Sequence, residues 1–471
     1  MGSLAQGQTG DYTRRQPEAC LAHVFGAFVL MLALYSAALA LALVAGAPWF
    51  LYQALRRQKY AGSLRERLGA LPVSLNLDGE PSIWIHAVSV GEVLAARPLA
   101  DELKTRYPGF RLFVSTTTSA GQQLAKRHLR DADAVFYFPI DFAFVVRRVL
   151  NRVRPRLLVL MEGEIWPNLL AECRRRGVKT VIVNGRISSR SFPRYRLIRP
   201  LLRRVLADVD AFCMQSEEGA RRIVAMGADG ARVTVTGSLK FDAARLPSVA
   251  VQGRPRDRVL RFFRLGPQRS VIVAGSTMRG EELPVLRAFR RIKTSSPQAL
   301  LVIAPRHADR FTEVVHVARG EGFAVARRSE LAIDAEPRAD VVVLDSIGEL
   351  AQLYQIATVA FVGGSLVPTG GHNILEPAVY GRPIVFGPSM SNFAEIADLF
   401  LTNAAALQVA DESSLERVLS DLVVDPVRRA SLGAAARALV DANRGATDRT
   451  LAVIGRLLPR PAVVRPFRRV H

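Results

Sequence analysis

The chain has few of the residues that form disulfides or hold metal ions. It carries three cysteines, Cys20, Cys173 and Cys213, without a CxxC spacing, and its seven histidines form no HExxH pair. A sparse, odd-numbered set of cysteines argues against a disulfide framework, and the missing ligand spacing argues against a zinc site. We therefore expect a protein body that works in a reducing compartment and needs neither a metal nor a cofactor.

Acidic residues are also scarce relative to basic ones. The 471 residues include 64 Lys and Arg against 42 Asp and Glu, a formal net charge of +22, and 49% of them are hydrophobic. A chain of this length and composition can build two or three globular domains. Its surplus of positive charge, mostly arginine, suits contact with phosphates or carboxylates. The candidate partners are therefore nucleic acid, an anionic membrane surface and a phosphorylated substrate.

Charged residues are missing altogether from Leu21–Leu55. The core of this stretch, Val24–Ala45, is as long as the roughly 20 apolar residues that cross a bilayer. It is too long for a cleaved signal peptide, and no small-residue cleavage site precedes the basic cluster from Arg56 to Arg67. We predict an N-terminal extension over 1–20 and a membrane anchor over 21–55, with the body on the cytoplasmic side of the membrane. A helix lying in the membrane interface is the alternative.

Beyond the anchor, short β-branched runs alternate with helical segments. Apolar strands separated by helices are typical of parallel sheets covered on both faces. Two such sets predict two doubly wound Rossmann-like α/β domains that face each other across a cleft. The predicted order is a first domain over 56–246, a linker over 247–264, a second domain over 265–455 and a basic tail over 456–471. The predicted strands lie at 82–87, 111–118, 134–139, 157–162, 180–185, 211–216, 233–238, 271–276, 300–305, 341–346, 359–365 and 383–388.

Polar residues follow the strands of the first set, where doubly wound sheets bind their ligands. Glu92 comes after the strand and turn of IWIHAVSVGE and opens a helical segment. A carboxylate there can complement the helix dipole, or it can point into a cleft and take a proton. Glu162 and Glu164 flank Gly163, and Lys240 follows the last strand. Any one of these is more often a solvated side chain, but several at corresponding positions of one sheet favour a site.

The second set carries a denser motif, FVGGSLVPTGGHNILEPAVYGRPIVFGP. Asn373 resembles a helix N-cap whose first-turn amides could bind phosphate. Glu376 could close a capping box or accept hydrogen bonds from ribose hydroxyls. We assign no chemistry to His372. The GK[ST] of a Walker loop and a GxGxxG after the first strand are both missing. Arg306, in APRH, is a cation at a strand end, placed for a phosphate or a carboxylate.

Seven motifs occur together in order: WIHAVSVGE, LLVLMEGEIWPN, VNGRIS, VTGSLKFD, APRH, FVGGSLVPTGGHNILEP and NRGAT. Over roughly residues 50 to 450 the chain resembles the 3-deoxy-D-manno-octulosonic acid (Kdo) transferases of lipopolysaccharide biosynthesis. The resemblance implies the two-domain GT-B glycosyltransferase fold and a membrane-associated N-terminus. It also implies transfer of Kdo from CMP-Kdo to the lipid A precursor lipid IVA, with inversion of the anomeric centre and without a metal.

The same resemblance implies roles for individual residues. Glu92 matches the general base, and Glu162 and Lys240 match positions that stabilise the transition state. The matching CMP contacts are Pro305, Arg306, Ile347, Gly348, Glu349, Asn373, Ile374, Leu375 and Glu376. The usual METELWPN is here MEGEIWPN, with Gly163 in place of Thr.

The positive charge then fits a bisphosphorylated lipid acceptor and anionic membrane lipids, and nucleic acid need not be invoked because aromatic-basic motifs are absent. Two alternatives remain at this point. One is another GT-B lipid glycosyltransferase or an epimerase that uses a UDP-sugar, because a fold does not define a function. The other is a catalytically silent, membrane-bound nucleotide-sugar binder. The number of Kdo residues transferred is open.

Overall fold

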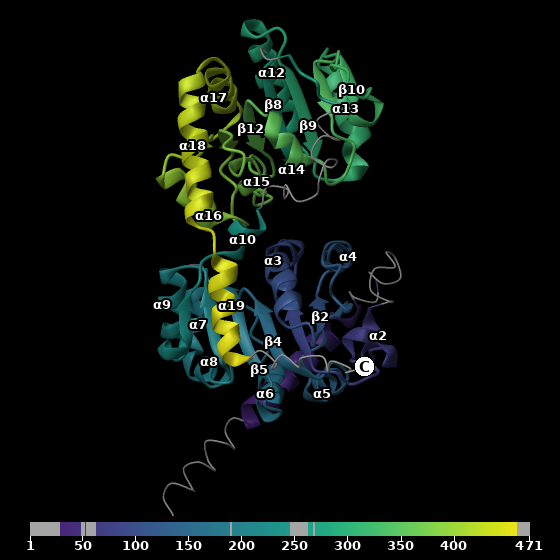
Figure 1. Cartoon of the computed structure of the whole chain (residues 1–471), viewed down its shortest axis with the longest axis vertical. Coiled ribbons are helices and arrows are strands. Elements are labelled where there is room, and N and C mark those ends of the chain that lie inside the picture. The colour runs from purple at the N-terminus through teal and green to yellow at the C-terminus, as the bar shows by residue number, and fades with distance from the viewer. Residues whose placement is uncertain are drawn as a thin grey trace, which may run out of the picture. The chain divides into compact units, whose positions relative to one another are not determined.

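The computed structural model describes residues 29–48, 52, 63–188, 191–244, 262–266 and 269–458. The chain divides into two compact units (Figure 1). Unit 1 comprises Met1–Ala243 and Gly445–His471, and unit 2 comprises Ala244–Arg444. Each unit contains one seven-stranded sheet, and the strand pairs of both sheets are parallel. The predicted α/β class with two doubly wound domains is confirmed.

In unit 1 the sheet order is β3-β2-β1-β4-β5-β6-β7. Its strands are β1 (Ser82–His86), β2 (Arg111–Thr116), β3 (Ala134–Tyr137), β4 (Pro155–Met161), β5 (Lys179–Gly185), β6 (Ala211–Met214) and β7 (Val233–Val235). Its helices are the apolar helix Val29–Pro48, α2 (Leu64–Arg67), η1 (Val73–Asn76), α3 (Val90–Arg106), α4 (Ser119–His128), α5 (Ala143–Val153), α6 (Pro167–Arg175), α7 (Phe192–Leu197), α8 (Arg199–Leu206), α9 (Glu217–Met226), η2 (Gly230–Arg232), α10 (Leu239–Ala243) and α19 (Ala446–Leu457).

In unit 2 the sheet order is β10-β11-β9-β8-β12-β13-β14. Its strands are β8 (Val271–Thr277), β9 (Leu300–Pro305), β10 (Val325–Arg327), β11 (Val341–Val343), β12 (Val359–Val362), β13 (Ile384–Phe386) and β14 (Leu407–Gln408). Its helices are α12 (Glu282–Ser295), η3 (Ala308–Arg310), α13 (Phe311–Gly320), η4 (Arg328–Glu330), α14 (Leu350–Leu353), η5 (Tyr354–Ile356), α15 (Leu375–Ala378), α16 (Ala394–Thr402), α17 (Glu412–Val424) and α18 (Pro426–Ala442).

All twelve predicted strands are present, and two edge strands were not predicted. These are β10 and β14, of three and two residues. Segments this short carry no periodic pattern from which a strand can be predicted. Both faces of each sheet are buried, as the near-continuous apolar strands require. In β1, for example, Trp84 belongs to the core on one face, and Ile83 and Ile85 belong to the core on the other.

The predicted domain ends need a correction at α19. The sequence places this helix at the end of the second domain, but the structure places it with unit 1. Asp242 caps it, accepting hydrogen bonds from the N–H groups of Gly445 (2.8 Å) and Thr447 (2.6 Å). Leu451 and Ile454 then pack into the core of unit 1. The predicted tail begins inside this helix, and residues 459–471 lie outside the described residues.

The predicted membrane anchor is a helix over Val29–Pro48, with a mean hydropathy of 2.3 and 6% of its most apolar window buried. Length and composition suit it to cross a bilayer. One of its side chains bonds to the body of unit 1, where Asn168 Nδ2 donates to Ser36 Oγ at 3.1 Å. The extension over 1–20, the cluster Arg56–Lys59 and most of the predicted linker lie outside the described residues.

Candidate functional site

The strand order reverses once in each sheet, and candidate residues lie at both reversals. In unit 1 the reversal falls between β1 and β4, and in unit 2 it falls between β8 and β12. Ligands of doubly wound sheets bind beyond the carboxyl ends of the strands at such a switch point. Glu92 follows β1 and Glu162 follows β4, so the topology brings together two residues that lie 70 positions apart in the sequence.

Glu92 lies in the first turn of α3, where its charge complements the helix dipole, and its carboxylate bonds to the residues just before the helix. Its Oε2 accepts a hydrogen bond from the Val88 N–H at 2.9 Å, and its Oε1 accepts one from Ser89 Oγ at 3.0 Å. The Ser89 hydroxyl in turn accepts the Glu92 N–H at 3.5 Å, a long contact. The structural role considered for this carboxylate is therefore present.

This structural role alone does not account for the ionisation of Glu92. The residue is 9% exposed. Burial, together with the negative charges of Glu162 and Glu164, raises its pKa from 4.5 to about 7, against the opposing effect of the two hydrogen bonds. A solvated carboxylate in that role would keep an ordinary pKa, whereas a general base works best with a pKa near the working pH. The environment of Glu92 therefore suits proton transfer.

Glu162 is presented by an unusual backbone turn at the end of β4. Its φ is +59°, in the left-handed region that non-glycine residues rarely adopt. Its N–H donates to the Val183 carbonyl at 2.9 Å, which holds the turn against β5. One oxygen of its carboxylate lies 3.4 Å from Lys240 Nζ, and both side chains are mostly buried. Strain of this kind is concentrated at functional sites.

Lys240 is positioned by short polar contacts at the start of α10. The Leu239 N–H donates to Asn184 Oδ1 at 3.0 Å, and the Lys240 N–H lies 3.4 Å from Ser238 Oγ. Asn184 also has a left-handed backbone, with φ of +55° at the end of β5. The predicted trio of Glu92, Glu162 and Lys240 therefore lies in one region of unit 1. Glu164 joins it, with its pKa raised by burial and by the charge of Glu162.

In unit 2 the switch point is organised by Glu281, which the sequence did not single out. This carboxylate is fully buried and accepts four backbone N–H groups. The donors are Met278 (2.8 Å), Gly364 (2.6 Å), Ser365 (2.9 Å) and Leu366 (2.9 Å). Glu281 thus joins the turn after β8 to the glycine turn after β12. In the sequence it stands beside Glu282, and no local signal separates the two.

The structure corrects the prediction of a phosphate-binding helix that begins at Asn373 after the glycine motif. α15 has four residues and begins at Leu375, with Ile374 at its N-cap. Asn373 Oδ1 does accept the Leu375 N–H at 3.1 Å, but Glu376 closes no capping box because its Oε1 instead faces Asn373 Nδ2 at 3.4 Å. Burial raises the pKa of Glu376 to about 7, while Asn373 and the positive charge of Arg306 act against the rise.

The other predicted CMP contacts have different surroundings. Pro305 ends β9, and the next residue, Arg306, has an exposed side chain while its N–H donates to the Thr277 carbonyl at 3.0 Å. Ile347 is 79% exposed, and Gly348 has φ of +92°. Glu349 is already engaged, accepting from Arg328 Nη2 at 2.8 Å and from Ser346 Oγ at 2.7 Å. Arg306 thus lies near enough to Glu376 for its charge to act on that carboxyl, while Ile347–Glu349 follow β11.

Comparison with known proteins shows the family to which this chain belongs. The family model of 3-deoxy-D-manno-octulosonic-acid transferase (kdotransferase) matches residues 62–243. A 3-deoxy-D-manno-octulosonic acid transferase of Haemophilus influenzae is 33% identical over 407 residues, which are 86% of this chain and 94% of that one. The chain belongs to the Kdo transferases. Another member, from Bordetella pertussis, is 36% identical over 377 residues, covering 78% of this chain and 86% of that one.

Two solved structures are similar to parts or most of the chain. The C-terminal CMP-Kdo binding domain of WaaA from Acinetobacter baumannii is 32% identical and covers 39% of this chain and 95% of that one, with a TM-score of 0.36. UDP-GlcNAc 2-epimerase from Neisseria meningitidis is 10% identical and covers 80% of this chain and 100% of that one, with a TM-score of 0.55. At that identity the epimerase shows the GT-B fold alone. This Kdo transferase is therefore a glycosyltransferase of lipopolysaccharide synthesis.

Proposed function

We propose that this Kdo transferase moves Kdo from CMP-Kdo to lipid IVA, inverting the anomeric centre, with Glu92 as general base. The observation that carries the proposal is the buried Glu92, whose pKa is raised to about 7 beside Glu162 and Glu164. The family supplies the transferred sugar, and the 32% identical CMP-Kdo binding domain supports the donor.

In the proposed step an acceptor hydroxyl oxygen attacks the anomeric carbon of Kdo as its bond to the phosphate of CMP breaks. Glu92 takes the hydroxyl proton, a contribution typically of about 10²–10⁴ in rate. Its hydrogen bonds to Val88 and Ser89 hold the carboxylate in one orientation at the helix start. A fixed base avoids the loss of orientation that a mobile glutamate would suffer.

Lys240 and Glu162 stabilise the charges that develop during this step. The ammonium of Lys240 is a cation in a largely buried position, where it offsets negative charge more effectively than it would in water. Glu162, 3.4 Å away, pairs with the ammonium of Lys240 and orients it. We assign Glu164 the role of adding negative charge that keeps the pKa of Glu92 high.

On the donor side, Arg306 and Asn373–Glu376 hold CMP. The guanidinium of Arg306 suits the phosphate, and the carboxylate of Glu376 suits the ribose hydroxyls. Pro305, Ile347, Gly348 and Glu349 are assigned to the same nucleotide. No metal is required by this scheme, and in the described part of the chain no group of three His, Cys, Asp or Glu side chains is arranged to hold one.

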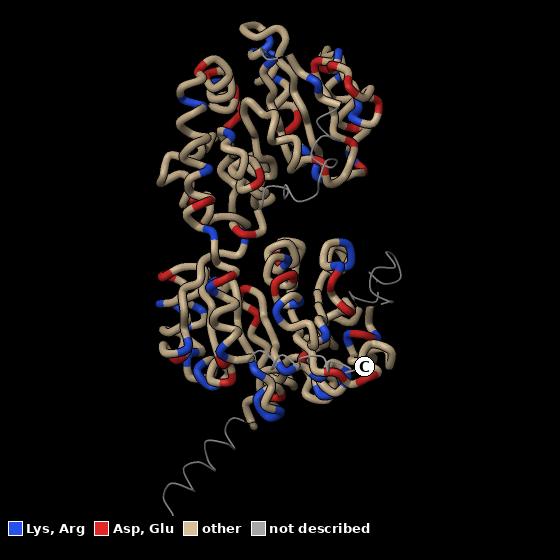
Figure 2. Tube along the Cα trace, viewed as in Figure 1, with Lys and Arg blue, Asp and Glu red and all other residues tan. Residues whose placement is uncertain are grey.

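For localisation we propose attachment to the cytoplasmic face of the inner membrane through the helix Val29–Pro48, aided by contact of basic residues with anionic lipids. The helix has the length and hydropathy of an anchor. Basic positions crowd around α5, α6 and α8 at the lower end of unit 1 in Figure 2. Each basic residue near an anionic leaflet adds about 1 kcal/mol of attraction.

The test is transfer by purified, detergent-solubilised protein, with CMP-Kdo generated in situ and lipid IVA as acceptor, read by mass spectrometry. Wild type, Glu92→Gln and the matched control Glu102→Gln on the exposed side of α3 are compared. We expect a mass gain of one or more Kdo units from wild type and the control, and none from Glu92→Gln. Absence of transfer by wild type, beside an active reference enzyme, would refute the donor or acceptor assignment.

A further inference from the structure

A cavity of about 460 Å³ lies between the apolar helix and the α5–α6 pair, within unit 1. One wall is the helix Val29–Pro48, which contributes Val29, Leu32 and Ala33. The opposite wall is Ala143 of α5 and Ala171 of α6. These side chains are apolar and mostly small, so the space between them suits a hydrocarbon chain.

Three arginines and one acid, Asp208, also line this cavity, so its polar part carries a surplus of positive charge. Arg147, Arg174 and Arg175 line it, and their side chains are 51%, 59% and 53% exposed. Each guanidinium has five N–H donors, and each of these three arginines pairs with one carboxylate. Arg147 and Arg175 share the carboxylate of Glu172, at 2.8 and 3.1 Å, and Arg174 lies 3.5 Å from Asp208. Donors therefore remain for a further anion.

Arg174 and Arg175 lie away from the catalytic residues. α6 runs from the carboxyl edge of the sheet back towards its amino edge, where β5 begins at Lys179. Arg174 and Arg175 form the last turn of α6, so they lie at the amino edge. Glu92 and Glu162 follow the opposite ends of their strands. An anion on these arginines is thus separate from the transfer site.

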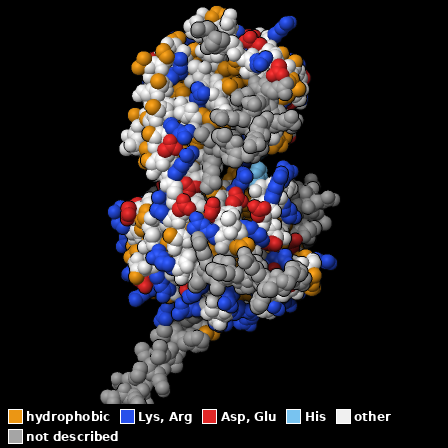
Figure 3. Space-filling view, viewed as in Figure 1, with side chains coloured by type: hydrophobic (Ala, Val, Ile, Leu, Met, Phe, Trp, Pro, Cys, Tyr) orange, Lys and Arg blue, Asp and Glu red, His pale blue; other side chains and the backbone are white. Residues whose placement is uncertain are grey.

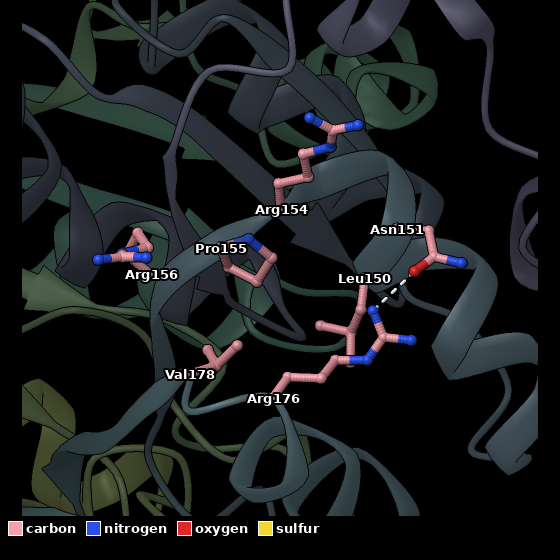
Figure 4. A pocket seen from close by; sticks show the side chains of 7 residues that line it. All are labelled: Leu150, Asn151, Arg154, Pro155, Arg156, Arg176 and Val178. Atoms are coloured by element: carbon pink, nitrogen blue, oxygen red, sulfur yellow. Dashed lines mark hydrogen bonds between the residues drawn. The ribbon is translucent and has the colours of Figure 1, made fainter.

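A second cavity, of about 380 Å³, adds positive charge at the C-terminal ends of α5 and α6 (Figure 4). Arg154, Arg156 and Arg176 line it together with Asn151, whose Oδ1 accepts from Arg176 Nη1 at 2.7 Å, and no acidic residue lines it. Arginines at helix C-termini can serve the helix dipole alone, but each terminus carries only about half a negative charge. The two helices therefore account for about one of the three positive charges. Figure 3 shows Lys and Arg side chains gathered over this lower end of unit 1.

We propose that the cavity beside the apolar helix binds one anionic glycerophospholipid of the membrane. An acyl chain lies against Leu32, Ala33 and Ala171, and the phosphate is held by the guanidiniums of Arg147, Arg174 and Arg175. The apolar wall belongs to the anchor itself, and the surplus charge of the neighbouring cavity selects an anionic headgroup over a zwitterionic one. This proposal rests on the proposed membrane attachment, because the attached protein would take the lipid from that membrane.

The test is native mass spectrometry of the full chain in nonionic detergent, titrated with phosphatidylglycerol or with phosphatidylcholine. We expect wild type to retain one phosphatidylglycerol and to bind phosphatidylcholine at least about ten-fold more weakly. Ala33→Phe, which fills the cavity and keeps its charge, should lose the bound lipid. Arg174→Gln should weaken binding about five-fold, as expected for one basic residue near an anionic lipid. The matched controls Ala38→Phe, elsewhere on the same helix, and Arg199→Gln, elsewhere in unit 1, should bind as wild type does.

Three results would overturn the site: unchanged binding by Ala33→Phe, equal retention of the two lipids, or displacement of phosphatidylglycerol by lipid IVA at equal concentration. The last would assign the cavity to the acceptor. Flotation of wild type with phosphatidylglycerol vesicles separates the two proposals. Flotation without a retained lipid leaves the membrane attachment standing and removes the site, whereas absence of flotation removes the attachment as well.

Discussion

Replacing Glu92 by Gln should abolish transfer and at the same time stabilise the protein at alkaline pH. The wild-type carboxyl is 9% exposed, and its pKa in the folded protein is about 7 instead of 4.5. The folded state therefore holds this proton more tightly than the unfolded state does. Its stabilising contribution is fully present below pH 4.5 and is lost as the pH rises through 7. Glutamine remains neutral throughout and avoids this loss.

The size of the effect follows from the shift in pKa. A shift from 4.5 to about 7 corresponds to about 3 kcal/mol once the carboxyl is fully ionised, near pH 9. For a unit of this size, that gain raises the melting temperature by roughly 6 to 12 °C. At pH 5 both proteins carry a neutral side chain, so we expect them to melt within a few degrees of each other.

The assay is thermal unfolding in detergent at pH 5, 7 and 9, followed by near-ultraviolet circular dichroism, beside the transfer reaction. Glu102→Gln is the control, because its carboxylate makes only a surface pair with Arg106 at 3.3 Å, and such pairs contribute about 0–1 kcal/mol. A melting difference between Glu92→Gln and wild type that is the same at pH 5 and pH 9 would refute the argument from burial. Full transfer activity of Glu92→Gln would refute the assignment of the base.

The remaining predictions concern the wider site. Lys240→Met should lower kcat about 10²–10³-fold, as loss of a charge-stabilising group does; an unchanged kcat would remove Lys240 from the mechanism. Glu281→Gln should destabilise unit 2 by about 3 kcal/mol, because two of the four backbone N–H donors would face an amide NH2 group in place of a carboxylate oxygen, and should weaken CMP binding measured by calorimetry. Asp242→Asn should increase hydrogen exchange in α19, whose first turn it caps, and exchange like that of wild type would contradict the capping role. Transfer should survive treatment with EDTA, and restoration of lost activity by a divalent cation would overturn the metal-free scheme.

Much of the fold was readable from the sequence because its signals are local. Apolar runs of five or six residues between helical segments predict buried parallel strands, and twelve of them were placed correctly. The uncharged stretch predicted an apolar helix, and the ordered motifs predicted the Kdo transferase family. The residues predicted for the site, such as Glu92, Glu162 and Lys240, were singled out because they follow strands, where parallel sheets bind their ligands.

Only the tertiary structure shows which of these residues meet. Strand order is not a local property, so the switch point that places Glu162 beside Glu92, and with it the raised pKa, could not be derived from spacing. Glu281 was missed because three of its four N–H donors come from residues 364–366, which lie more than 80 positions further along the chain. The length of α15 and the docking of α19 depend on packing, which overrides local preference when the competing energies are a few kcal/mol. The sequence determined the strands, the helices and the candidate site residues. The tertiary fold decided how deeply those residues are buried and which of them are in contact.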